Sequence, residues 1–375
     1  MSATTESPAS SNSTNLLDSE FRYQLLTVSY SIIFILGLFA NLYVLFVLRG
    51  LRGAKAMGEI RIYMTNLTVA DLLFVCALPF WISYYHRDGH WIFGDLLCRL
   101  TGPQFFINTY CSILFLGVIS VNRYWAVTRP LDAACSDHRR RGIIVSIIIW
   151  TVTIAMALPY LISPATNMDK QNITRCFEGY QNDDDGSKRK LLATHLAIIA
   201  LFFVVFFLVL ICNLLIARTL LTQSPIKTGL KASAGVTRKS VSAKSPTGVK
   251  RRALQMLIAV VGVFIVCFLP HHVVQGFWTA AVLQIKEGWG QVDWTDNTRQ
   301  ALNDAHQVTL VLMGLNCVLD PVVYCFATRK FRRFIVAHLK KLAKGERCTQ
   351  AFTTELSVDS HNQSQRFNNE RNEME

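Results

Sequence analysis

Histidine and amide side chains interrupt several long apolar stretches of this sequence, and they are the residues best suited to chemistry there. His271, His272 and Gln275 lie within about one and a half turns of a helix. His195 and His306 stand near the ends of two other stretches. Imidazole and amide groups can donate hydrogen bonds to phosphate. A single such histidine is more often a packing residue, but four in similar positions indicate a polar binding site.

Two carboxylates, Asp71 and Asp320, also lie inside apolar stretches. Two buried carboxylates that lie close together cannot both ionise freely, so they would share a proton or hold a cation between them. A sodium ion fits this arrangement, with Ser112 and Asn316 as neutral ligands. A hydrogen-bonded structural network without an ion is the alternative.

Patterns of metal-dependent enzymes are absent from the sequence. It contains no HExxH motif and no CxxC or Cys/His spacing typical of zinc sites. We therefore expect neither an enzyme nor a cofactor, apart from the candidate sodium ion.

The elements that carry these polar residues are predicted to be membrane-spanning helices. Apolar residue types make up 51% of the 375 residues and charged types only 17%, below the quarter usual in soluble proteins. About 20 apolar residues span a bilayer, and backbone groups in lipid must be satisfied within the helix. The predicted fold class is an all-α bundle of seven transmembrane helices. The candidate spans are residues 24–48, 62–86, 100–122, 142–168, 191–217, 253–285 and 305–328.

The positions of the basic residues predict the topology. The net charge is +13, and Lys and Arg cluster after the first, third, fifth and seventh spans. The positive-inside rule then places the N-terminus outside and the C-terminus inside, at the plasma membrane. It also explains the positive charge without a nucleic-acid partner. Asn12 and Asn172 begin glycosylation sequons on the expected outer side.

The expected organisation has four parts around this bundle. Residues 1–21 form a disordered extracellular tail, and residues 22–328 form the bundle, with a flexible cytoplasmic loop at 223–249. Residues 329–344 alternate basic and apolar types, which is typical of an amphipathic helix on a membrane surface. Residues 345–375 form a disordered cytoplasmic tail. Cys348 is a candidate for palmitoylation, and an unmodified thiol is the alternative.

Several short motifs, in order along the chain, resemble one receptor family. They are Asn41, Leu67-Thr-Val-Ala-Asp71, Trp91-Ile-Phe-Gly94, Cys98, Trp150, Cys176, Cys267-Phe268-Leu269-Pro270 and Asp320-Pro321-Val322-Val323-Tyr324. One of these motifs alone would be weak, but the whole set is specific. The chain thus resembles the rhodopsin-like G-protein-coupled receptors over residues 22–344. Five further segments resemble most of all a subgroup whose ligand is a phosphocholine ether lipid: Asp18-Ser-Glu-Phe-Arg-Tyr23, Phe105-Phe-Ile-Asn-Thr-Tyr-Cys111, Arg175-Cys-Phe-Glu178, Pro270-His-His-Val-Val-Gln275 and Asn303-Asp-Ala-His-Gln-Val-Thr-Leu310.

The resemblance implies roles for particular residues. Cys98 and Cys176 would form a disulfide that ties the second outer loop to the third helix. The implied ligand shell is Phe105, Phe106, His195, His271, His272, Gln275, Gln307 and Thr309. Tyr84, Tyr85, Tyr110 and Trp278 are further aromatic candidates for contact with choline, and Glu178 and Asp304 are candidate counter-charges.

The resemblance also implies a switch and its partners. Motion would pass through Phe264, Phe268 and Pro270 to the inner residues Asn122, Arg123, Tyr124, Asp320, Pro321 and Tyr324. A heterotrimeric G protein would then bind and trigger phosphoinositide and calcium signalling, while a receptor kinase and arrestin would act on serines and threonines of the C-terminal tail. Asn122 stands where the family has an aspartate, so Arg123 lacks the adjacent carboxylate that would hold it inactive. This departure would raise basal activity.

Other functions stay open at this point. A receptor for another lipid, a nucleotide or a chemokine-like peptide would have the same fold. A transporter or channel is a more distant alternative, because no inverted repeat is evident.

Overall fold

The computed structural model describes residues 19–51, 58–129, 138–169, 172–178, 184–222, 255, 257–286, 288–327 and 329–343. Within these residues, seven helices are long and apolar enough to cross a membrane, which confirms the predicted fold class. They are α1 (Glu20–Gly50), α2 (Gly58–His86), α3 (Gly94–Thr128), α5 (His138–Ile162), α6 (Asp185–Thr222), a sixth helix from Leu257 that ends with α8 (Leu269–Leu283), and α9 (Asp296–Gly314) continued by α10 (Asn316–Ala327).

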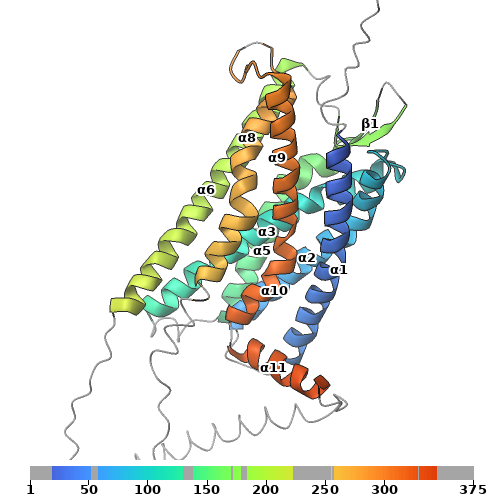
Figure 1. The fold of residues 1–375 in the computed structure, drawn as a ribbon. Coiled ribbons are helices and arrows are strands. Elements are labelled where there is room, and N and C mark those ends of the chain that lie inside the picture. Colours follow the sequence, from blue (N-terminus) through green and yellow to red (C-terminus); the bar gives the residue numbers. More distant parts are fainter. Residues whose placement is uncertain are drawn as a thin grey trace, which may run out of the picture. The chain divides into compact units, whose positions relative to one another are not determined.

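Helix α3 is the central element of the bundle. It packs against α2, α5 and α6, and α8 packs between α6 and α9. Figure 1 shows α6, α8 and α9 as neighbours, with α1 beside α2. The outward faces of the helices carry exposed apolar side chains such as Phe39, Ile147 and Leu214, as expected for surfaces that meet lipid.

The helix boundaries differ from the predicted spans where local chemistry decides them. The fourth helix ends at Ile162, not near Met168, because Pro164 disfavours helical geometry at the residue before it. The chain then forms β1 (Thr166–Met168), which pairs antiparallel with β2 (Thr174–Cys176). Helix α9 begins at Asp296, nine residues before the predicted span. The Thr295 side chain caps it by accepting a hydrogen bond from the amide of Thr298.

The start of α1 is likewise capped. Ser19 accepts a hydrogen bond from the amide of Arg22, so the helix begins at Glu20, within the segment expected to be a tail. Expectations for residues 1–18, the loop 223–249 and the tail 345–375 lie outside the described residues, as do Asn12 and Cys348.

The sixth helix changes its geometry in mid-membrane. Residues Phe264–Phe268 form a π-helical turn, and Pro270 follows in the first turn of α8. A proline removes one backbone donor, and a π-turn absorbs an extra residue, so both favour a bend here. The bend lies beside the histidine pair His271 and His272.

Helix α11 (Arg329–Ala343) covers nearly the whole segment expected to be a surface helix. Its basic and apolar residues fall on different faces, as the alternation in its sequence indicates.

Candidate functional site

Four histidines meet in one cavity between α3, α5, α6, α8 and α9. The cavity has a volume of about 190 Å³. We call it the histidine cavity. Its lining includes Phe105, Phe106, Tyr110, Tyr160, His195, His271, His272, Gln275, Trp278, His306, Leu310 and Met313.

His272 is held by contacts on three sides. Its Nδ1 donates to the carbonyl oxygen of Phe268 at 2.8 Å, so Nε2 must be the acceptor for the hydroxyl of Tyr110 at 2.9 Å. The imidazole also stacks on Phe202, with 3.8 Å between the ring centroids. Both nitrogens are therefore occupied, and His272 serves as a wall of the cavity.

His306 joins α9 to α8. Its Nε2 donates to Oε1 of Gln275 at 2.7 Å, and its ring lies parallel to that of Trp278 at 3.8 Å. The other nitrogen, Nδ1, is buried and has no hydrogen-bond partner among the described residues. A buried polar atom left this way usually marks a place for water or ligand.

The remaining two histidines also give their N–H groups to the protein. Nδ1 of His195 donates to the carbonyl of Leu191 at 3.0 Å. Thr309 uses its hydroxyl proton on the carbonyl of His306, so Nδ1 of His271 is the donor in its 3.4 Å contact with Thr309. Neutral imidazoles would thus present lone pairs, not N–H groups, to a ligand.

A second cavity of about 280 Å³ adjoins the first between α1, α2, α3 and α9. We call it the aromatic cavity. Phe105, Phe106, Tyr160, His195 and Leu310 line both cavities. Its own walls include Tyr30, Phe74, Ala77, Leu78, Trp81, Tyr85 and Phe177.

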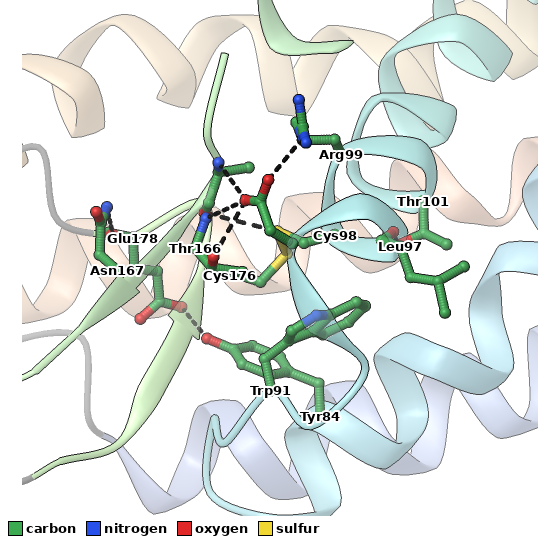
Figure 2. Close-up of a disulfide and its surroundings, with 12 residues drawn as sticks. Tyr84, Trp91, Leu97, Cys98, Arg99, Thr101, Thr166, Asn167, Cys176 and Glu178 are labelled. Atoms are coloured by element: carbon green, nitrogen blue, oxygen red, sulfur yellow. Dashed lines mark hydrogen bonds and ion pairs between the residues drawn. A yellow bond between two sulfur atoms is a disulfide. The ribbon is translucent and has the colours of Figure 1, made fainter. Parts of the chain in front are cut away.

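The hairpin β1–β2 forms the roof of the site. Cys98 of α3 and Cys176 of β2 are joined by a disulfide, with 5.8 Å between their Cα atoms. Figure 2 shows this bridge beside Thr166, whose amide and hydroxyl donate to the carboxylate of Asp95. These contacts fix Phe177, the residue after the bridge, above the aromatic cavity.

Glu178 pairs with the first helix and is not available as a counter-charge for choline. Its carboxylate accepts hydrogen bonds from Arg22 and, at 2.9 Å, from the hydroxyl of Tyr84. Figure 2 shows the Glu178 side chain turned toward Tyr84. Asp304, the other candidate, accepts from Gln300 at 3.0 Å.

The structure brings together most of the predicted ligand shell, with two exceptions. Gln307 and Thr309 do not line either cavity; Gln307 is buried and donates to Asn303 at 3.3 Å. His306, one of the four histidines expected at a polar site, lines the histidine cavity together with Leu310 and Met313. Leu310 and Met313 lie four and seven residues after His306, on one face of a helix, and this spacing is the sequence signal that would have added them to the predicted shell.

The two aspartates lie in a polar core on the cytoplasmic side of the cavities. Nδ2 of Asn108 donates to Asp71 at 2.8 Å, and Asn316 donates to Ser112 at 3.0 Å. The contact from Ser112 to Asp320 is 3.5 Å, which is weak. One carboxylate oxygen each of Asp71 and Asp320, and the amide oxygen of Asn316, are buried without a hydrogen-bond partner in the described residues. A set of oxygens with no donor fits a hard cation.

At the cytoplasmic ends of the helices, Arg123 has no carboxylate at the adjacent position 122, but the carboxylate of Glu59 lies in its surroundings. Glu59 of α2 accepts two hydrogen bonds from Arg141 of α5, at 2.7 and 2.8 Å. The guanidinium of Arg141 lies 4.4 Å from the ring centroid of Trp125, near Arg123 on α3. Glu59 also attracts Arg123 electrostatically. Asn122 makes no hydrogen bond through Nδ2 within the described residues.

The predicted switch residues of the sixth and seventh helices are mostly buried. Phe264 packs against both Phe202 and Phe206 and meets Phe268 at 5.5 Å between centroids. Tyr324, like Asp320, is almost fully buried. Tyr124 and Pro321 are half-buried.

Of the sequon residues, Asn172 lies in the turn between β1 and β2, where its side chain is exposed. At the start of α6, the hydroxyl and amide of Ser187 donate to Asp184, and these hydrogen bonds hold the pKa of that exposed carboxyl below its usual range.

Comparison with known proteins places the chain among receptors. Residues 40–324 match the family described as 7 transmembrane receptor (rhodopsin family). The platelet-activating factor receptor of Cavia porcellus is 46% identical over 355 residues, which cover 92% of this chain and 96% of that protein. The corresponding receptor of Homo sapiens is 46% identical over 342 residues, covering 90% and 92%. Cysteinyl leukotriene receptor 1 of Cavia porcellus is 32% identical over 327 residues, 87% of each chain.

Proposed function

The chain belongs to the rhodopsin family of seven-transmembrane receptors, and from that premise we propose that its ligand is platelet-activating factor, an acetylated phosphocholine ether lipid. Members of this family are multi-pass membrane receptors that act through G proteins, not enzymes. The choice of this particular lipid is supported by receptors that are 46% identical to this chain over about nine tenths of its length.

One observation carries the proposal: four histidines, a glutamine and a ring of aromatic side chains surround a single buried cavity. Aromatic faces attract a quaternary ammonium. His195, His271 and His306 each have a second ring nitrogen that can donate to the phosphate once it takes up a proton. A nucleotide site would need more Arg and Lys, and no Arg or Lys lines the two described cavities.

Signal transfer follows from the packing below the cavity. We propose that the ligand prefers the state in which the lower part of the sixth helix has moved outward about the bend at Phe264–Phe268 and Pro270. Arg123 and Tyr324 then rearrange and open a groove for a G-protein helix. Phosphoinositide and calcium signalling, and later capture by a receptor kinase and arrestin, are the expected outputs.

Asp71, Ser112, Asn316 and Asp320 are the residues that would hold a sodium ion in this scheme. The ion would offset part of the negative charge of the two carboxylates and so stabilise the packed state of the bundle. Plasma-membrane insertion with an extracellular N-terminus, glycosylation at Asn12 and Asn172 and palmitoylation at Cys348 complete the proposal.

The test is calcium release in cells that express the chain, titrated with platelet-activating factor and with its lyso form, which lacks the acetyl group. We expect a saturable response to the acetylated lipid alone. His306→Ala and Gln275→Ala should lower its potency at least tenfold, since each removes a polar group of the cavity. His86→Ala is the matched control, because His86 is exposed at the end of α2.

Silence of a receptor shown to reach the cell surface would reject the ligand. A panel that includes cysteinyl leukotrienes, nucleotides and chemokines would then identify the ligand class.

A further inference from the structure

The aromatic cavity is a space among the described residues that polar chemistry does not explain. Its volume is about 280 Å³, and most of its surface is apolar. Thr101, one of its few polar residues, already donates its hydroxyl proton to the carbonyl of Leu97 at 2.7 Å. An uncharged apolar group is therefore the occupant that this cavity suits.

We propose that the aromatic cavity is the compartment for the hydrocarbon chain of a lipid whose headgroup lies in the histidine cavity. This inference rests on the proposed lipid function and adds to it the position of the lipid's hydrocarbon chain.

The shared wall of the two cavities is the first argument. The rings of Phe105, Phe106 and Tyr160 line both spaces. Neither volume, about 190 or 280 Å³, reaches the roughly 300–1,000 Å³ usual for a ligand of this size. A molecule with a polar head and a long apolar tail would need both.

Charge decides which end of the lipid enters which cavity. The guanidinium of Arg22 lies 5.4 Å from the ring centroid of Tyr85, a wall of the aromatic cavity. Glu178, the nearby carboxylate, is paired with that guanidinium. The face of Tyr85 thus already carries a guanidinium, and Glu178 is engaged by it, so this wall offers a quaternary ammonium little attraction. A hydrocarbon chain needs neither group.

The roof places one more aromatic ring against this cavity. Phe177 adopts a left-handed backbone conformation, with φ 57°, directly after the disulfide. Its ring lies so close to Gly102 that a Cβ added there would come within 2.1 Å of Cε2. The contact between Gly102 and Phe177 thus adds apolar surface to the cavity, and each methylene buried against apolar surface is favourable.

The experiment measures potency for a series of platelet-activating factor analogues whose alkyl chain is shortened two carbons at a time. Each methylene that leaves the cavity should cost about fourfold in potency. Ala77→Leu narrows the cavity and should shift the best chain length downward. Leu78→Ala widens it and should shift the best length upward.

The control is Leu67→Ala, a matched loss of a buried leucine on α2 that lines neither cavity. Its chain-length profile should equal that of the wild type. Surface expression of each variant is measured in parallel, and because the two test substitutions act in opposite directions, poor folding cannot mimic both shifts.

Two results would overturn the inference. If the chain-length profiles of Ala77→Leu and Leu78→Ala both match that of the wild type, the hydrocarbon chain of the lipid lies outside the aromatic cavity. A changed preference between choline and ethanolamine headgroups, with the chain-length profile kept, would place the headgroup in the aromatic cavity. If the wild type answers none of the analogues, the proposed lipid function itself fails, and the inference fails with it.

Discussion

The hydroxyl of Tyr110 on α3 donates a hydrogen bond to Nε2 of His272 on α8, at 2.9 Å. With Nδ1 given to the carbonyl of Phe268, this histidine has no nitrogen left for a ligand. The contact joins α8 to the central helix directly above the bend in the sixth helix. It also shows why adjacent histidines, His271 and His272, have different surroundings.

Removal of this contact should destabilise the receptor. Tyr110→Phe keeps the ring but leaves Nε2 of His272 buried without a donor, at a cost of about 1–3 kcal/mol. We expect a lower melting temperature for the purified, ligand-free protein. Tyr160→Phe is the control, since the structure gives its hydroxyl no hydrogen bond within the described residues. Equal melting temperatures for the two variants would contradict the prediction.

Agonist binding should strengthen as the pH falls. His195, His271 and His306 each give one N–H to the protein, so the remaining nitrogen must take up a proton before it can donate to a phosphate. The complex then binds more protons than the free receptor, and the Kd rises with pH by at most tenfold per unit for one proton.

Radioligand binding to membranes between about pH 6 and pH 8 would check this dependence. His306→Gln should flatten it if that ring carries the proton, while His86→Ala should leave it unchanged. A Kd that is constant across this range would show that the phosphate is bound by neutral groups.

The ion pair between Arg22 and Glu178 should stabilise the roof. The two side chains are 8% and 15% exposed, so removal of one partner leaves a poorly solvated charge. Arg22→Met should lower the free energy of unfolding by about 3–5 kcal/mol. Arg22→Met with Glu178→Gln should recover much of the loss, because no charge is then left unpaired. Equal thermal stability of the single and double variants would refute this account.

Sodium should stabilise the ligand-free receptor. At a tenfold excess over its Kd, an ion bound only by the folded state adds about 1.4 kcal/mol. The melting temperature should therefore rise in sodium chloride relative to potassium chloride at equal ionic strength. Asp71→Asn should abolish the difference, since it removes one of the two carboxylates. An identical effect of both salts on the wild type would favour a hydrogen-bonded network without an ion.

Asn122→Asp should lower agonist-free signalling. The substitution places a carboxylate beside Arg123, which would hold the arginine in the inactive arrangement. Glu59 supplies some negative charge to this region, but Arg141 already takes two of its hydrogen bonds. Inositol phosphate accumulation without agonist, normalised to surface expression, measures the effect. Thr128→Asp is the control, because it adds a carboxylate to the same helix at an exposed position five residues beyond Arg123. Equal agonist-free signalling of Asn122→Asp and the wild type would contradict the prediction.

The sequence by itself determined the membrane helices and the family. A bilayer offers no hydrogen bonds to the backbone, so each long apolar stretch has one outcome, a helix. Pro164 and Thr295 also carried local signals for a helix end and a helix start, although hydropathy alone placed both boundaries elsewhere. The motif order then implied the disulfide of Cys98 with Cys176, which the structure contains.

Only the tertiary structure decided which side chains meet. The rotation of α9 places His306, not its neighbour Gln307, in the cavity, because rotation depends on packing against α8 and not on local sequence. Arg22 and Glu178 meet across 156 residues of chain, so no spacing rule could pair them. The hydrogen bond of His272 to Phe268 is local, but the hydroxyl on its other nitrogen comes from Tyr110, 162 residues away. Only the packing of α8 against α3 brings the two together, and it thereby decides that His272 is a wall and not a donor.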